Sequence, residues 1–285
     1  MADYLVGVLG GGLVDPRAPL LRPDDLGVIR GDGCFETMRV AGPRAGHVDE
    51  LDAHLGRLAG SAAAIGLPAP DLDAWRHLVA ELLAGWQRPG EAALRLILTR
   101  GPESAPEPTT TGFGTLTPVR PAALRQRRDG LRVVTLNRGL SVRALADAPW
   151  LLGGAKTTSY AVNLAALRHA AQLGADDVIF RSVEGTVLEG PTSTVLWLAD
   201  GVLHSPPPEL LGLLPGITVQ AIYRRAADHG FDTSITAGTL DDLRSADGIW
   251  LVSSVRLVAP VRSLDGVPCA PDPAVTARVL AAAIG

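Results

Sequence analysis

The stretch Gly153-Gly154-Ala155-Lys156-Thr157-Thr158-Ser159-Tyr160 decides which fold and which chemistry we expect from this sequence. Of the 26 lysine and arginine residues in the chain, Lys156 alone is a lysine. Arginine cannot replace lysine where a neutral nitrogen must attack a carbonyl carbon, because the guanidinium group stays protonated. The first hypothesis is therefore a lysine that forms a Schiff base. The alternative is a surface lysine left in place by a strong preference for arginine.

Composition narrows the class of protein. The 285 residues are 47% hydrophobic and 20% charged, with a formal net charge of -4, as expected for one large domain or two domains of ordinary size. This charge gives no basic surface for nucleic acid or membrane. Two cysteines exclude a disulfide framework, and the histidines show no metal-ligand spacing. Residues 1–4 lack a basic leader. We expect a cytoplasmic protein that acts on a small molecule and binds no metal.

Hydrophobic periodicity predicts a two-domain protein of mixed α and β structure. In the first half, apolar residues alternate as in strands or recur at helical spacing, and glycine and proline separate the segments. The predicted elements there are a hairpin over residues 5–14, strands over 34–40 and 94–99, and helices over 48–65 and 71–84. Residues 101–112 are rich in proline and threonine and predict a loop.

The second half is expected to be rich in antiparallel strands. Its predicted elements are strands over 131–136, 178–180, 186–188, 194–198, 202–203 and 248–253, a helix over 160–173, and another helix after Pro215-Gly216. The domain division that follows is a smaller N-terminal domain over 1–117, a connector over 118–130, and a larger C-terminal domain over 131–285 that carries Lys156.

Three further segments carry polar groups that suit a phosphorylated cofactor. Glu189 follows an apolar stretch, Gly216-Ile217-Thr218 stands at a predicted helix N-terminus, where backbone amides attract anions, and Ser253-Ser254 ends a strand. Pyridoxal phosphate needs a lysine, an acid beside its ring nitrogen, and donors for its phosphate. Each piece has an ordinary alternative, a solvated turn residue for Glu189 and a plain helix cap for the glycine and threonine.

Together and in this order, these segments resemble the class IV aminotransferases, the fold-type IV pyridoxal-phosphate enzymes. The resemblance covers nearly the whole chain. It rests on the blocks 30–40, 54–58, Lys156 with 174–177, 184–190, and 214–218. It implies an α+β fold of two domains, similar to D-amino-acid aminotransferase, with pyridoxal 5'-phosphate between the domains, and a homodimer. Gly31 and Gly33 do not make a dinucleotide fingerprint, because Glu36 stands where the third glycine is needed.

The resemblance also implies roles for individual residues. Lys156 would bind the cofactor covalently, Glu189 would pair with its ring nitrogen, and Arg57, Ile217, Thr218 and Ser254 would hold its phosphate. Arginine suits that place because its forked guanidinium matches phosphate oxygens. The alternative for Arg57 is a side chain that packs along a helix and keeps its charge in solvent.

The residues expected to face the substrate separate the branches of the family. D-amino-acid aminotransferases carry an Arg-x-His carboxylate trap after the strand that ends here at Arg100-Gly101, and this chain has no histidine there. Branched-chain enzymes carry an Arg-Pro pair within the strand, where this chain has Arg95-Leu96. What remains resembles the aminodeoxychorismate lyases, especially in the blocks 31–37 and 253–256. These enzymes convert 4-amino-4-deoxychorismate to 4-aminobenzoate and pyruvate, a step toward folate, as carbon-oxygen lyases.

The substrate of that lyase has two carboxylates, so the sequence predicts arginines that bind it. Arg100 and Arg256 are the candidates, and a structural ion pair is the alternative for each. Thr37 and Tyr160 are predicted to line the pocket or orient the lysine, the alternatives being a strand hydroxyl and a core tyrosine. An aminotransferase for D-amino or branched-chain acids, and a pyridoxal-phosphate-binding protein without turnover, are the competing functions.

Overall fold

The computed structural model describes residues 4–42, 46–107 and 109–285. Residues 1–3, part of the segment for which the sequence predicts no basic leader, lie outside the described part. The chain forms two compact units. Unit 1 comprises Met1–Arg120 and Ala155–Tyr160, and unit 2 comprises Pro121–Gly154 and Ala161–Gly285. The lysine segment therefore groups with unit 1, whereas the sequence-based division assigned it to the C-terminal domain.

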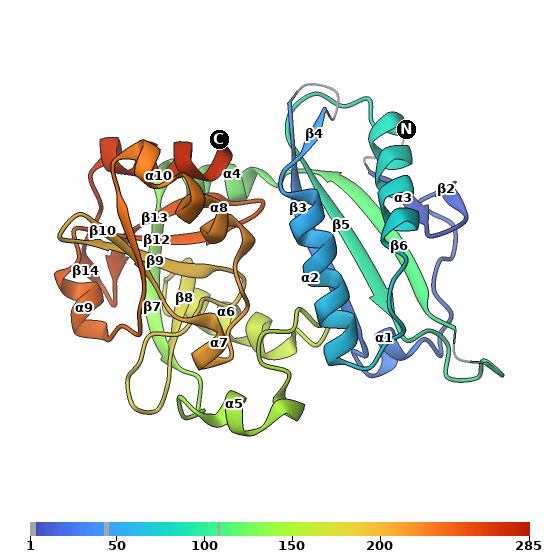
Figure 1. The fold of residues 1–285 in the computed structure, drawn as a ribbon, viewed down its shortest axis with the longest axis horizontal. Coiled ribbons are helices and arrows are strands. Elements are labelled where there is room, and N and C mark those ends of the chain that lie inside the picture. The colour runs from blue at the N-terminus through green and yellow to red at the C-terminus, as the bar shows by residue number, and fades with distance from the viewer. Residues whose placement is uncertain (1–3, 43–45, 108) are drawn as a thin grey trace. The chain divides into compact units, whose positions relative to one another are not determined.

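The described part of unit 1 has a six-stranded antiparallel sheet in the order β2-β1-β6-β5-β3-β4. The strands are β1 (Leu5–Val8), β2 (Gly12–Val14), β3 (Gly33–Ala41), β4 (His47–Val48), β5 (Ala92–Thr99) and β6 (Thr111–Pro118). The helices are α1 (Leu26–Ile29), α2 (Leu51–Ala64) and α3 (Leu72–Gly85). Helices α2 and α3 lie along the sheet (Figure 1).

Strand alternation determines which side chains of unit 1 the helices cover. Cys34, Met38 and Val40 of β3 are buried in one cluster with Leu55 and Leu58 of α2. Because successive side chains of a strand point to opposite faces, Phe35, Thr37 and Arg39 lie on the other face of the sheet. Glu36 lies on the covered face, where a carboxylate needs partners that compensate its charge.

Unit 2 has an eight-stranded mixed sheet, again in the described part. Its main order is β11-β10-β9-β12-β13-β7-β8, and β14 pairs with β13. The strands are β7 (Leu131–Asn137), β8 (Asp177–Arg181), β9 (Thr194–Ala199), β10 (Val202–Ser205), β11 (Asp232–Ile235), β12 (Gly248–Ser253), β13 (Leu257–Leu264) and β14 (Val267–Pro268). Strands β7 and β8 are parallel, as are β13 with β7 and β10 with β11, and the other pairs are antiparallel.

The helices of unit 2 are α4 (Pro121–Asp129), α5 (Ala144–Asp147), α6 (Ala161–Gln172), α7 (Pro208–Leu211), α8 (Ile217–Arg225), α9 (Leu240–Ser245) and α10 (Pro273–Ile284), with short 3-10 turns at Pro149–Leu151 and Ala227–His229. Of these helices, α4, α6, α8 and α10 pack on this sheet. One cluster joins Leu196 of β9 and Trp250 of β12 to Ile222 of α8 and Val279 of α10. The site segments of unit 2 lie at the ends of these strands and helices.

Most of the predicted elements are confirmed, and the exceptions have physical reasons. Residues 186–188 form only isolated bridges and no strand. Residues 121–129, inside the predicted connector, form α4 although their composition is polar, because the helix packs against β13. The sequence analysis also missed β13, α10 and β6. Strand β6 carries two glycines where α3 lies close: a Cβ on Gly114 would meet a leucine side chain of that helix at 2.9 Å.

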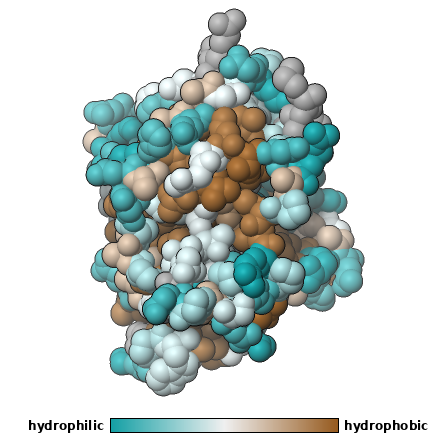
Figure 2. All heavy atoms as spheres, turned by 90° about the vertical axis from the view of Figure 1, so that its right-hand side faces the viewer, coloured by the Kyte–Doolittle hydropathy of each residue, from teal (hydrophilic) through white to brown (hydrophobic). Residues whose placement is uncertain are grey.

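The surface mixes polar and apolar residues. Figure 2 shows apolar residues gathered in the middle of one face of the molecule, with hydrophilic residues around them. Trp150 and Val162 are the most exposed large hydrophobic side chains of unit 2, at 76% and 71%. Within the residues that the structure describes, every helix is too short or too polar to cross a lipid bilayer.

Candidate functional site

The lysine segment is hydrogen-bonded to the start of β3 in unit 1, on the edge that β5 does not pair. The Phe35 amide donates to the Lys156 carbonyl at 3.0 Å, and the Thr158 amide donates to the Gly33 carbonyl at 2.8 Å. On the other side, the Lys156 amide donates to Ser61 Oγ of α2 at 3.0 Å. These bonds fix the Lys156 backbone to the rigid sheet and helix, so the amine starts from a defined position.

The Lys156 amine lies between two aromatic rings. Its Nζ is 3.2 Å from the hydroxyl oxygen of Tyr160 and 4.6 Å from the centre of the Phe35 ring. The two rings meet edge to face with centroids 5.2 Å apart. An aromatic face stabilises an ammonium ion, and the phenol can donate to a neutral amine, so this site accommodates both protonation states of the lysine.

Thr37 lies on the same face of the β3–β5 pair as Phe35. Its Oγ1 accepts a hydrogen bond from Arg95 Nε at 3.3 Å, and the Arg95 guanidinium carbon lies 6.0 Å from the Phe35 ring centre. The sequence analysis did not include Arg95 in the site. Thr37 and Arg95 are register partners across the two strands. Without that register, the alternation of β5 alone could not show which neighbours Arg95 meets.

Arg57 belongs to a buried network on α2 and β3. Its Nε and Nη2 donate to the two oxygens of Glu36 at 2.7 and 2.8 Å, and His54 Nδ1 lies 2.6 Å from Glu36 Oε2. Burial raises the pKa of the Glu36 carboxyl, but the bonds from Arg57 and His54 outweigh it and lower that pKa to about 2. Burial lowers the pKa of His54. Glu36 is thus ionised, and neutral His54 donates its Nδ1 proton.

Arg100 makes a different set of contacts in unit 1. Its Nε donates to Asp32 Oδ2 at 2.6 Å, its Nη2 to the Ile65 carbonyl at 2.6 Å, and its Nη1 to the Gly66 carbonyl at 3.2 Å. All three nitrogens therefore bind protein oxygens and join the end of α2 to the turn before β3. These contacts favour the structural ion pair that the sequence analysis had left open.

In unit 2, the Glu189 carboxylate accepts hydrogen bonds from Arg138 and from a backbone amide. Arg138 Nη1 lies 3.3 Å from its Oε1, and the Leu214 amide donates to its Oε2 at 3.2 Å. The side chain is 18% exposed. The hydrogen bond from the Leu214 amide thereby links the predicted acid to the segment that leads into α8.

Helix α8 begins with the residues predicted to hold phosphate. Its N-cap is Gly216, which offers no side chain to the first amides of the helix, and Ile217 and Thr218 follow as buried residues. A Cβ on Gly216 would meet Thr194 Oγ1 at 2.3 Å, so close packing requires glycine here. A helix N-terminus of this kind binds anions through its amides and its dipole. Ser254 directly follows β12.

Arg256 is buried beside Asp177. Its Nη1 donates to Asp177 Oδ2 at 2.6 Å, and the residue is 8% exposed. Its Nε and Nη2 are buried without a hydrogen-bond partner in the described part of the chain. Buried guanidinium nitrogens are costly unless they are hydrogen-bonded, which sets Arg256 apart from Arg100.

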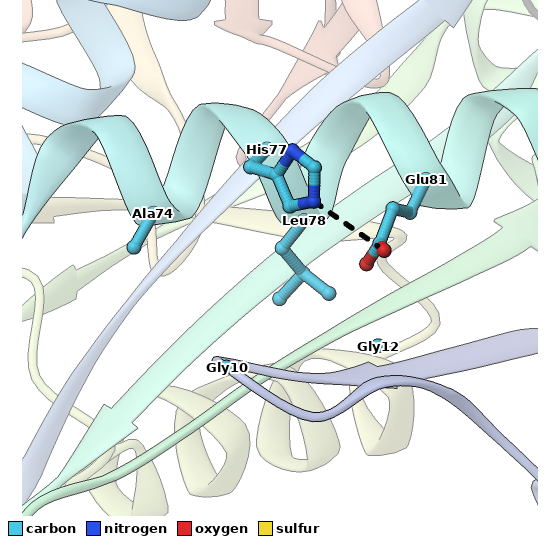
Figure 3. Close-up of a pocket in the computed structure, with 6 residues that line it drawn as sticks. All are labelled: Gly10, Gly12, Ala74, His77, Leu78 and Glu81. Carbon is cyan, nitrogen blue, oxygen red and sulfur yellow. Dashed lines mark ion pairs between the residues drawn. The ribbon is translucent and has the colours of Figure 1, made fainter.

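Unit 1 also has a small pocket, and none of the residues that line it is among the site residues described above. It is formed by the turn that contains Gly10 and Gly12 and by α3, with Leu78 at its base (Figure 3). His77 Nε2 and Glu81 Oε1 lie 3.5 Å apart at its rim, and the His77 side chain is 78% exposed. Both side chains reach solvent, as in an ordinary ion pair on a helix surface.

A family model named amino-transferase class IV matches residues 33–264. The chain belongs to this family. It is 44% identical to a "bifunctional aminodeoxychorismate lyase / D-amino acid transaminase" of Mycobacterium tuberculosis, over 98% of this chain and 99% of the relative. The PLP-bound structure of a "hypothetical aminotransferase" from that organism has a TM-score of 0.93 at 43% identity, with 99% of each chain covered. A fold IV transaminase from Curtobacterium pusillum has a TM-score of 0.91 at 42% identity, with 98% of each chain covered.

Membership in the class IV family confirms the predicted fold class and the predicted cofactor, pyridoxal 5'-phosphate. The residues of this chain fit the cofactor's chemistry. Lys156 is the one primary side-chain amine of the sequence, the start of α8 offers amides to a phosphate, and Glu189 offers a carboxylate to a ring nitrogen. The identification leaves open whether the enzyme is a lyase or a transaminase.

Proposed function

We propose that this class IV enzyme is an aminodeoxychorismate lyase, which converts 4-amino-4-deoxychorismate to 4-aminobenzoate and pyruvate. The observation that carries the proposal is the 44% identity, over nearly the full length of both chains, to the relative whose name includes this lyase. The sequence supports it independently, because the Arg-x-His trap and the Arg-Pro pair of the two aminotransferase branches are absent after and within residues 94–99.

The proposed cofactor ligands come from both units. Lys156 would bind the cofactor covalently, Arg57, Ile217, Thr218 and Ser254 would hold its phosphate, and Glu189 would keep its ring nitrogen protonated. Glu189 suits this role because a guanidinium, that of Arg138, and the Leu214 amide hold its carboxylate in place. When bound, the cofactor supplies an electron sink for the carbon that loses a proton.

Lys156 is proposed to act as the general base and acid. Its amine would remove the proton from the ring carbon that bears the substrate nitrogen, while the bond from the adjacent carbon to the enolpyruvyl oxygen breaks. The departing fragment gains a proton on its methylene carbon and leaves as pyruvate, so a 2-oxo acid is not consumed. Tyr160, 3.2 Å from Nζ, would orient the amine and share its proton. Thr37 would line the same face of the sheet.

Arg256 is the stronger of the two proposed substrate arginines on geometric grounds. Among the described residues, its Nε and Nη2 have no hydrogen-bond partner, as expected for a group that binds a carboxylate. Arg100 already uses its three nitrogens on protein oxygens. The substrate has two carboxylates, so a second cation is needed. Arg95, which donates to Thr37 on the face of the sheet where the lysine amine lies, is a candidate for it.

D-amino-acid transamination is a second candidate function, because the same relative carries that activity in its name. Lysine and cofactor serve both reactions, and dependence on an acceptor separates them, since transamination needs a 2-oxo acid. A homodimer and a cytoplasmic location stay predictions.

The test is to give the purified holoenzyme 4-amino-4-deoxychorismate without any 2-oxo acid and to measure pyruvate and 4-aminobenzoate. The lyase predicts both products in equal amounts, and none from Lys156→Ala. Absence of product, together with transfer of the amino group from D-alanine to 2-oxoglutarate, would replace the lyase by the transaminase. Lys156→Arg is the matched control for charge, since it retains a cation but cannot form the Schiff base.

A further inference from the structure

Glu36 and His54 form a charge network with Arg57 that the reaction itself does not use. Glu36 is fully buried and His54 is 1% exposed, while the Arg57 side chain is 11% exposed. A buried carboxylate is costly unless charged or polar partners compensate it. Three polar side chains at one place between α2 and β3 therefore call for an explanation beyond stability.

We propose that Glu36 and His54 are positioning residues, which hold the Arg57 guanidinium in the orientation that binds the cofactor phosphate. The inference rests on the proposed role of Arg57 as a phosphate ligand. Glu36 takes the edge of the guanidinium formed by Nε and Nη2, with bonds of 2.7 and 2.8 Å. A phosphate bound by Arg57 would then meet a guanidinium whose plane Glu36 already holds.

His54 fixes Glu36 in turn. Its Nδ1 lies 2.6 Å from Glu36 Oε2, the same oxygen that accepts from Arg57 Nη2. An ionised carboxylate only accepts hydrogen bonds, so His54 must be the donor in this pair. His54 thus holds Glu36, and Glu36 holds Arg57. His54 and Arg57 are three residues apart on α2 and therefore lie on one side of the helix.

Orientation has a measurable value because the arginine side chain is flexible. A free arginine loses about 2 kcal/mol of rotamer freedom when it is fixed, which corresponds to at most about 30-fold in affinity. An arginine already fixed on Glu36 loses little on binding phosphate. Since Glu36 also carries a negative charge that opposes phosphate binding, a fair test must change the geometry and keep that charge.

Glu36→Asp meets this condition, because it keeps the carboxylate and shortens its reach by one methylene. The readout is the ratio of two affinities of the full-length apoprotein, for pyridoxal 5'-phosphate and for pyridoxal, which lacks the phosphate. We expect Glu36→Asp and His54→Leu to lower this ratio about five- to tenfold. His54→Asn, whose amide nitrogen replaces Nδ1 as a donor, should restore it to within about twofold.

The matched control is Glu91→Asp. Glu91 pairs with Arg39 Nη2 at 2.9 Å in the same unit, and this change should leave the ratio unaltered. Equal loss of both affinities in Glu36→Asp, or no change in their ratio, would overturn the inference. Arg57→Ala separates the two proposals: if it leaves the ratio unchanged, Arg57 is not the phosphate ligand, and the assignment on which the inference rests fails with it.

Discussion

Replacement of Glu36 by glutamine should make stability depend on pH in a defined way. The variant keeps the shape of the side chain and loses its charge. The pKa of this carboxyl is 4.5 in its ordinary state and about 2 in the folded chain, where burial opposes ionisation but Arg57 and His54 favour it more strongly. One unit of pKa is worth about 1.4 kcal/mol, so the ionised group contributes about 3 kcal/mol to folding.

The sign follows from linkage. The folded-state pKa of Glu36 is depressed, so its contribution is fully present above pH 4.5 and is lost as pH falls toward 2. Between wild type and Glu36→Gln we therefore expect a gap in the free energy of unfolding of about 3 kcal/mol at pH 7. The same relation gives about 2 kcal/mol at pH 3.5. Other carboxyl groups titrate equally in both proteins and cancel.

The assay is urea unfolding of the two apoproteins at pH 7, 5.5 and 3.5, followed by circular dichroism. Hydrogen exchange of peptides that cover β3 assigns the effect to unit 1. A gap that keeps its size from pH 7 to 3.5 would refute the reasoning, because the cost would then come from packing and not from ionisation. A gap under about 1 kcal/mol at pH 7 would mean that burial cancels the benefit of the two partners.

Three further changes have defined outcomes. Tyr160→Phe removes the hydroxyl 3.2 Å from Lys156 Nζ, and we expect kcat to fall about tenfold with an unchanged melting temperature; an unchanged kcat would exclude Tyr160 from proton transfer. Gly33→Ala places a Cβ 2.8 Å from a carbonyl oxygen of β5, so it should lower the free energy of unfolding of unit 1 in urea by about 1–3 kcal/mol. It should also displace the lysine segment, which would be measured as slower cofactor uptake. Wild-type stability and uptake would contradict the close packing. Asp177→Ala leaves the Arg256 guanidinium buried without its carboxylate and should cost about 3–5 kcal/mol, while Asp177→Ala with Arg256→Leu should cost less; equal costs would show that the charge is not the cause.

The sequence determined the chemistry of this protein to the level of the family. A single lysine among arginines, an acid after an apolar stretch and a glycine at the start of a helix are local features that suit pyridoxal phosphate, and their order along the chain resembles that of the class IV aminotransferases. Alternation and helical spacing also predicted many of the helices and strands, because both follow from which side chains leave water, but they did not predict β6, β13 or α10.

Tertiary structure decided what each polar side chain meets. Arg57 and Arg100 look alike in the sequence, yet Arg57 pairs with Glu36 and Arg100 joins three protein oxygens near Asp32. Helix α4 formed in a polar segment because β13 lies beneath it, and the lysine segment joined β3 through hydrogen bonds across more than 100 residues of chain. Such partners depend on strand register and packing between distant segments, and periodicity within one segment does not record them.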